Sequence, residues 1–208
     1  MRQGSLVSAT IALALALASC GGGSSATSKT SNHQPAPTTT LPPPNLKPLL
    51  LSVTDLPTGW SVDNSKSGGS STFKGCKTFN TVNQTDSAST EFTDGGLPVL
   101  VESLGWSPNA PALLKSGIAN VNQCKSMTIS NNGQTEKATM GPMSFPTVGS
   151  KSAAYQMIVN IKGLNVDFDI VIAQKGNYLV LVALGDLGPP NTTQLQQFVS
   201  AAMTKIPA

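Results

Sequence analysis

Histidine and arginine, on which much active-site chemistry depends, each occur once in this chain. Among its 208 residues they are His33 and Arg2, and His33 lies in a stretch of Gly, Ser, Thr and Pro. A Ser-His-Asp or Cys-His nucleophile therefore has no base in the apolar-patterned part of the chain, and a metal site there has no imidazole ligand. Bidentate arginine contacts to phosphate or carboxylate are excluded as well. These absences predict a protein that is not an enzyme and that carries no cofactor.

Closely spaced carboxylates are the remaining candidates for acid–base or metal chemistry. Asp167 and Asp169 lie two residues apart, which places them on one face of a strand. Apolar residues at positions 166, 168 and 170 alternate with them, and this alternation favours a solvated strand face. Calcium needs six to eight oxygen ligands, and the pair has no third ligand in the sequence pattern. Two other acid pairs have no better ligand set, namely Glu91 with Asp94 and Asp55 with Asp63.

The first of three cysteines, Cys20, follows a segment with the parts of a signal peptide. Arg2 supplies the positive charge, residues 6–17 are mostly apolar, and residues 17–19 form the small-residue approach to a cleavage site. A dozen residues are too few to span a bilayer as a helix, which needs about 20. One interpretation is an ordinary secretory peptide in which Cys20 has no role.

The four residues "LASC", Leu17 to Cys20, resemble the bacterial lipobox. In that family the cysteine sulfur receives a diacylglycerol, and cleavage makes the cysteine the new N-terminus. The resemblance implies a lipoprotein signal peptide at residues 1–19 and an acylated Cys20 that contacts the membrane. Two or three acyl chains anchor a protein stably, whereas one is marginal. We expect a lipid anchor at the extracytoplasmic face of the cell membrane.

Residues 20–45 have the composition of a tether. After Cys20 they are mostly Gly, Ser, Thr, Pro and Asn and show no apolar periodicity. Such a segment buries too little surface to offset the entropy lost on ordering, so we expect it to be disordered. A chain of this kind has a root-mean-square span of about 30 Å. We expect it to hold one folded domain, residues 46–208, away from the membrane.

Cys76 and Cys124 remain once Cys20 is acylated. In an exported chain a disulfide is the default, and one here would close a loop of nearly fifty residues. The chain-entropy relation values such a loop at about 4 kcal/mol. The alternative is a free nucleophilic cysteine, which would lack a histidine to activate it. We expect the disulfide.

The patterns of residues 46–208 predict an α+β fold, in which an antiparallel sheet is flanked by helices. Alternating apolar residues indicate strands on both sides of "KGL", and the continuous apolar run at residues 178–184 indicates a central strand covered on both faces. The other expected elements are a short helix at 48–53, strands near 89–93 and 99–104, a helix opened by Ser107 or Asn109, hairpin turns at 131–133, 162–164 and 175–177, and a last helix opened by Asn191 and Gln194.

Five aromatic residues are the candidates for lining an apolar ligand site, although in a chain with only 5% aromatic residues such side chains more often belong to the core. A lipid or a small apolar molecule would be the ligand of such a cleft; the alternative is that these side chains are simply core. The net charge is +3 with 11% charged residues, which gives no electrostatic footprint for nucleic acid. The five candidates are Trp60, Trp106, Tyr155, Phe168 and Tyr178.

Three segments add a family resemblance: "LLLSVTDLPTGWS" at 49–61, "VGSKSAAYQM" at 148–157 and "AQKGNYLVLVAL" at 173–184. With the lipobox and the tether, they resemble envelope lipoproteins of mycobacteria and related actinobacteria. The folded part is similar to the extracellular sensor domain of PknH-type kinases and to LpqN-like, Mog1/PsbP-type domains. The resemblance implies an antiparallel sheet flanked by helices, a cleft for an unidentified ligand and no established catalysis. PknH-type sensors usually carry two disulfides, whereas this chain can form one.

Two functions follow from these expectations, and they belong to different classes. The first is a lipid-anchored, non-catalytic domain of the cell envelope that is sensor-like or binds a small molecule or lipid in a cleft. The second is a structural or protein-interaction lipoprotein, for which an exposed apolar patch or an unpaired sheet edge would be the mark. An enzyme built on aspartate and lysine alone is a third, minor hypothesis. The sequence names no protein partner.

Overall fold

The computed structural model describes residues 44–64, 72–76, 86–131 and 134–207. The signal peptide, Cys20, His33 and nearly all of the tether lie outside the described residues, as does most of the expected turn at 131–133. The described part holds one sheet, two α-helices and two 3-10 turns. The predicted α+β class with an antiparallel sheet is confirmed.

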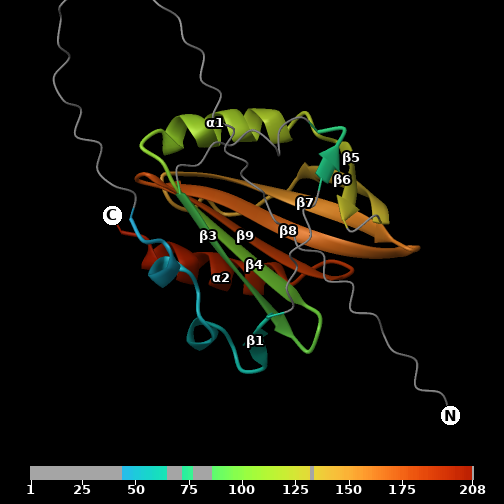
Figure 1. The fold of residues 1–208 in the computed structure, drawn as a ribbon, viewed down its shortest axis with the longest axis horizontal. Coiled ribbons are helices and arrows are strands. Elements are labelled where there is room, and N and C mark those ends of the chain that lie inside the picture. The colour runs from blue at the N-terminus through green and yellow to red at the C-terminus, as the bar shows by residue number, and fades with distance from the viewer. Residues whose placement is uncertain (1–43, 65–71, 77–85, 132–133, 208) are drawn as a thin grey trace, which may run out of the picture.

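Nine strands form the sheet in the order β1-β3-β4-β9-β8-β7-β6-β5-β2, and each named pair is antiparallel. Figure 1 shows this sheet as a strongly twisted ribbon with β8 and β9 at its centre. The strands are β1 (Trp60–Val62), β2 (Thr72–Lys74), β3 (Asp86–Asp94), β4 (Val99–Trp106), β5 (Ser126–Asn131), β6 (Gln134–Pro142), β7 (Lys151–Ile161), β8 (Leu164–Lys175) and β9 (Tyr178–Leu187).

The tight turns between the long strands have a local cause in the sequence. At the β7–β8 hairpin, Lys162 and Gly163 both adopt positive φ, 52° and 90°, and Ile161 pairs with Leu164. This is the two-residue geometry whose twist matches the flanking strands. Gly176 has φ 55° in the β8–β9 turn. The predicted turns at 162–164 and 175–177 are confirmed.

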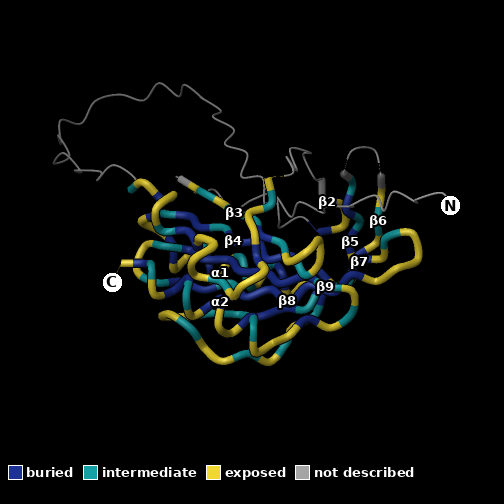
Figure 2. The backbone as a smooth tube through the Cα atoms, turned by 90° about the horizontal axis from the view of Figure 1, so that it is seen from below, coloured by how far each residue is buried: buried dark blue, intermediate teal, exposed yellow. Residues whose placement is uncertain are grey.

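Successive residues of a strand point to opposite faces of the sheet, so the sheet has two cores. One core lies on the face covered by α1 (Ala110–Val121), and we call it the α1 face. The other lies on the face covered by α2 (Thr192–Lys205) and by the N-terminal segment, residues 44–56; we call it the α2 face. Figure 1 shows α1 and α2 on opposite sides of the sheet, and Figure 2 shows the buried residues concentrated in the strands between them.

Helix α2 begins and ends with defined hydrogen bonds. The Asn191 side chain accepts a hydrogen bond from the backbone N–H of Gln194 at 3.1 Å, which confirms the predicted N-cap. At the other end, Lys175 Nζ donates to the carbonyls of Met203 and Ile206 at 3.2 and 2.7 Å. Its charge lies where the helix dipole is negative.

Helix α1 begins directly after Asn109, one of its two candidate caps. Asn109 occupies the N-cap position without a side-chain capping bond, and the Ser107 hydroxyl accepts the Asn109 N–H at 3.2 Å instead. Among the apolar residues of α1, Leu114 and Val121 are buried, while Leu113 and Ile118 are partly buried against the α1 face. Helix α1 therefore lies where the sequence predicts it, and two of these four apolar side chains are only partly buried.

The N-terminal segment departs from the expected helix at 48–53. Two 3-10 turns, Lys47–Leu49 and Val53–Asp55, flank an extended stretch at Leu50–Ser52. Leu50 and Leu51 are both buried, and the Leu51 N–H donates to Glu102 rather than to the carbonyl four residues back. An α-helix would have used that N–H internally. Tertiary contacts have therefore replaced local helix formation.

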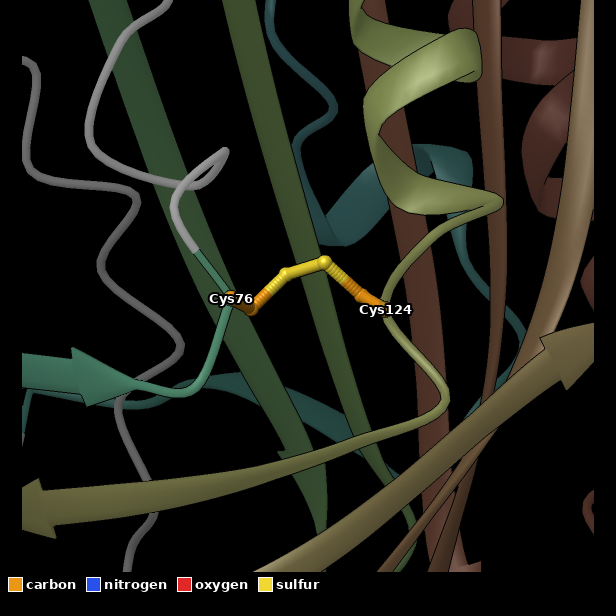
Figure 3. Close-up of a disulfide and its surroundings, with 2 residues drawn as sticks. All are labelled: Cys76 and Cys124. Atoms are coloured by element: carbon orange, nitrogen blue, oxygen red, sulfur yellow. A yellow bond between two sulfur atoms is a disulfide. The ribbon is translucent and has the colours of Figure 1, made fainter.

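The disulfide joins Cys76 to Cys124, with a Cα–Cα distance of 5.4 Å. Figure 3 shows it linking the residues after β2 to the segment that leaves α1. Both cysteines are buried in the core of the α1 face. The predicted pairing is confirmed.

Candidate functional site

A cleft of about 390 Å³ lies between the N-terminal segment and strand β3. This volume falls within the usual range for small-molecule sites. One wall is the N-terminal segment and the other is the first half of β3. The lining residues are Asn45, Leu46, Lys47, Leu50 and Leu51 from the segment and Ser87, Ala88, Ser89 and Thr90 from β3.

Four consecutive residues of β3 line the cleft, and this places the cleft at the edge of the sheet. Neighbouring side chains of a strand point to opposite faces, so a cavity on one face would contact every second residue. Strand β1 pairs with this edge only from Phe92 to Asp94, and the Asp63 N–H donates to the Glu91 carbonyl at 2.9 Å. No described strand pairs with residues 88–90 on that side.

Glu102 lies directly behind the cleft, on β4. It is the cross-strand partner of Thr90, and Leu51 donates its N–H to Glu102 Oε2 at 2.6 Å. The side chain has no exposed surface, and within the described part of the chain its Oε1 has no hydrogen-bond partner. A wall residue of the cleft is thus held by a carboxyl group in the core.

Burial raises the pKa of Glu102 from 4.5 to about 7, because the charged form loses its hydration. The bond from Leu51 and the charge of Lys205 act in the opposite direction and are outweighed. A carboxyl group with this pKa changes its charge near neutral pH. It is also the acceptor that fixes Leu51, so its charge state bears on the cleft wall.

A surface ion pair links the N-terminal segment to α2. Lys205 Nζ lies 2.7 Å from Asp55 Oδ2, and the two side chains are 26% and 29% exposed. Asp55 also accepts from the backbone N–H and hydroxyl of Ser52 at 2.8 and 2.7 Å. The hydrogen bonds from Lys205 and Ser52 lower the pKa of Asp55 from 3.8 to about 2. Asp55 therefore stays ionised at any physiological pH.

The predicted solvated face at Asp167 and Asp169 is wrong. Both carboxylates are buried on the α2 face, 7% and 4% exposed. The cause is the last part of the chain: the start of α2 covers this face, and Asp169 hydrogen-bonds Thr192 there and Gln156 of β7. Burial, reinforced by the charge of Asp167, raises the pKa of Asp169. The described residues contain no group of three side chains suited to hold a metal ion.

The five aromatic candidates do not line one cleft. Tyr155 and Phe168 belong to the core of the α1 face, whereas the other three pack on the α2 face. Trp60 stacks edge-on against Phe198 of α2, with ring centroids 5.2 Å apart. None of the five contacts the cleft beside β3. Trp106 of β4 and Tyr178 of β9 are cross-strand neighbours on the α2 face.

No family model matches the sequence, and no curated protein matches it. Among solved structures, the extracellular domain of PknH from Mycobacterium tuberculosis matches 70% of this chain and 80% of its own, with a TM-score of 0.53 and 14% identity. The chain shares its fold with the PknH extracellular domain. A second match, the Rv0999 ortholog from Mycobacterium smegmatis, covers 74% of this chain and 92% of its own, with a TM-score of 0.43 and 13% identity.

The match to PknH confirms the predicted resemblance to PknH-type sensor domains at the level of the fold. At 14% identity it transfers no individual residue. The candidate site is therefore defined by the cleft and by Glu102, and no residue role in it is taken from PknH. Sequence analysis missed both, although one signal was present: Glu102 alternates with Leu100 and Leu104 on a strand whose other face is apolar as well.

Proposed function

We propose that this chain is a lipid-anchored, sensor-like binding domain of the cell envelope, without catalysis of its own, that takes its ligand in the cleft beside β3. The observation that carries the proposal is the cleft itself: leucine side chains on one wall and hydroxyl groups on the other, with a buried carboxyl group behind. Five of the nine described lining residues are polar and four are apolar, so the cleft offers a ligand both hydrogen-bonding groups and apolar contact.

The extracytoplasmic location is supported by three independent features. The lipobox-like residues at Leu17 to Cys20 supply a membrane anchor. The fold is shared with a domain that is extracellular in its own protein. The disulfide between Cys76 and Cys124 suits an oxidising compartment. Among the described residues, no helix is long and apolar enough to cross a membrane.

The anchor is tested by phase separation in a detergent that splits into aqueous and detergent-rich phases. Wild-type protein from its own cells is expected in the detergent phase, and Cys20→Ala in the aqueous phase, because the acyl chains are lost. Cys20→Ala protein that stays with the detergent phase would contradict lipid anchoring at Cys20. A mass increase on the N-terminal peptide of wild type, absent from the variant, provides a second readout.

The cleft is tested by native mass spectrometry of protein purified from its own cells. Wild type is expected to carry a bound mass that Ala88→Leu lacks, because Ala88 lines the cleft and a leucine there fills it. Ala119→Leu is the matched control, since Ala119 is exposed on α1 and lies away from the cleft. Equal ligand on wild type and Ala88→Leu would overturn the cleft as the binding site.

Protein–protein interaction, the second predicted function, is also favoured by an observation. The outer edge of β3 at residues 88–90 has no strand partner among the described residues, and unpaired edges are places where chains associate. A cleft and an open strand edge at the same place support binding of a ligand that can use both.

A further inference from the structure

The direction of the backbone groups along β3 shows which of them face the cleft. In an antiparallel strand, the N–H and C=O of one residue point to the same side, and the side alternates along the chain. The carbonyl of Glu91 faces β1, because it accepts the Asp63 N–H, whereas the Asp94 N–H donates to Pro98 at the start of β4. The register with β4 is continuous from Asp86 to Thr93. The N–H and C=O of Ser89 therefore face away from β4, toward the cleft.

The opposite wall of the cleft offers an apolar surface. Leu46 and Leu50 line the cleft from the N-terminal segment, and Ala88 lines it from β3 and packs against the same core. Leu50 is followed by Leu51, which is fixed to Glu102. The apolar wall is thus held in place by the core and is present without a ligand.

Among the described residues that line the cleft, the charged one is Lys47. Its side chain is exposed at the rim, on the first 3-10 turn. The other polar lining residues are neutral: an asparagine, two serines and a threonine. A ligand that carries a negative charge near Lys47 therefore meets a favourable field, and a positively charged one does not.

We propose that the cleft binds an extended peptide that adds as a strand to β3 beside Ser89. The peptide's backbone exchanges hydrogen bonds with Ser89, one apolar side chain contacts Leu46, Leu50 and Ala88, and a carboxylate lies near Lys47. This proposal rests on the proposed function and names the ligand class. It lies along the same edge of β3 to which β1 is hydrogen-bonded as far as Glu91.

Backbone chemistry favours a peptide over a lipid or another apolar molecule. The Ser89 N–H requires an acceptor and the Ser89 C=O requires a donor at strand spacing, and an extended peptide supplies both. A hydrocarbon chain would cover these groups without bonding them, which opposes binding. Apolar side-chain pockets beside a strand edge then select the sequence of the added strand.

The test is selection of a displayed library of random heptapeptides on purified protein with its disulfide intact. The expected result is enrichment of peptides that alternate apolar residues and carry an acid. Their synthetic forms should bind wild type, and N-methylation of alternate backbone nitrogens should abolish binding, because it removes the donors and leaves the side chains. No enrichment, or binding that survives every N-methylation, would overturn the proposal.

Substitutions at Ser89 separate the backbone from the side chain. Ser89→Pro removes an N–H that β4 does not use, and proline is tolerated at strand edges, so the variant is expected to fold and to bind the selected peptides at least tenfold more weakly. Ser89→Ala keeps the N–H and should bind like wild type. Equal binding by Ser89→Pro and wild type would overturn the proposal.

A charge reversal covers the case in which Ser89→Pro fails to fold. Lys47→Glu is exposed and leaves the core unchanged; it should weaken acidic peptides about threefold to tenfold and reduce their salt dependence. Unchanged binding of acidic peptides would contradict the place given to Lys47. A small amphiphile that binds wild type and Ser89→Pro equally, but not Ala88→Leu, would overturn the peptide and leave the proposed function standing.

Discussion

The two faces of the sheet are built from different chemistry. The core of the α1 face is an apolar cluster that includes the disulfide. Glu91 of strand β3 has one buried carboxylate oxygen on this side, but as a whole it is only partly buried. The α2 face buries three carboxyl groups, those of Glu102, Asp167 and Asp169, since each alternates with residues of the α2-side core. The elements that cover it come from the two ends of the domain.

Burying a carboxyl group costs stability unless hydrogen bonds or opposite charges compensate. The α1 face bears less of that cost, because Glu91 is only partly buried, and a covalent bond adds to its stability. The α2 face bears it, and both the cleft and the bond from Leu51 to Glu102 lie on that side. The difference separates a face that serves mainly stability from a face whose polar groups are in a position to respond to a ligand or to pH.

The largest expected effect is on the α1 face. Replacing Cys76 and Cys124 together with alanine should lower the free energy of unfolding by about 4 kcal/mol, because the unfolded chain regains the entropy of a loop of 48 residues. Urea denaturation measures this, and reduced wild type should match the variant. A loss below about 1 kcal/mol would show that this face does not depend on its disulfide.

The second effect tests the α2 face through pH. A carboxyl group whose pKa is raised on folding contributes full stability below its unfolded pKa of 4.5 and loses it as pH rises through about 7. Between pH 5 and 8 wild type should therefore lose about 2.5 kcal/mol relative to Glu102→Gln, which keeps an acceptor for Leu51 but does not titrate. If the free energy of unfolding changed with pH by the same amount in the two proteins, the raised pKa of Glu102 would be contradicted.

The third effect concerns packing in the middle of the α1 face. A Cβ added to Gly185 would overlap the ring of Phe168, which lies directly over it from the neighbouring strand. Gly185→Ala should therefore cost about 2 kcal/mol by thermal or urea unfolding. Gly117→Ala is the control on α1: no atom lies within 4 Å of its added Cβ, and it should gain up to about 1 kcal/mol. Equal effects would show a loosely packed core.

The smallest effect is expected where the N-terminal segment meets α2. Lys205→Ala should cost about 0.5 kcal/mol, since its pair with Asp55 is partly exposed. The lowered pKa of Asp55 gives the opposite sign to Glu102: the contribution is present above 3.8 and is lost as pH falls toward 2. Lys115→Ala, exposed on α1, serves as control. A cost that persists in high salt would point to a role beyond the ion pair.

The sequence predicted the elements whose pattern is local. Alternation at residues 166–170 gave β8, the asparagine before α2 gave its cap, and cysteine content gave the disulfide. Strand β8 and the cap of α2 depend on residues that are neighbours in the chain. The disulfide could be predicted because only two cysteines remain once Cys20 is set aside. The fold class could be predicted because apolar residues repeat at every second position in a half-buried strand and at about every 3.6 positions in a helix.

The site could not be predicted, because it depends on segments distant in sequence. Leu51 and Glu102 are fifty-one positions apart in the sequence, and the residues around Glu102 do not predict the hydrogen bond between them. Asp167 and Asp169 alternate with apolar residues as solvated acids do, yet a later helix buries them. The aromatic residues were assigned to one cleft by type, whereas strand alternation divides them between the two faces.

The disulfide also links folding to location. Thiols stay reduced in the cytosol, so an exported chain would have Cys76 and Cys124 unjoined until it crosses the membrane. Natural domains are stable by only about 5–15 kcal/mol, and about 4 kcal/mol is a large share of that. A newly made chain would therefore remain closer to the unfolded state while it waits for translocation. It would gain its full stability only in an oxidising compartment, where the disulfide forms.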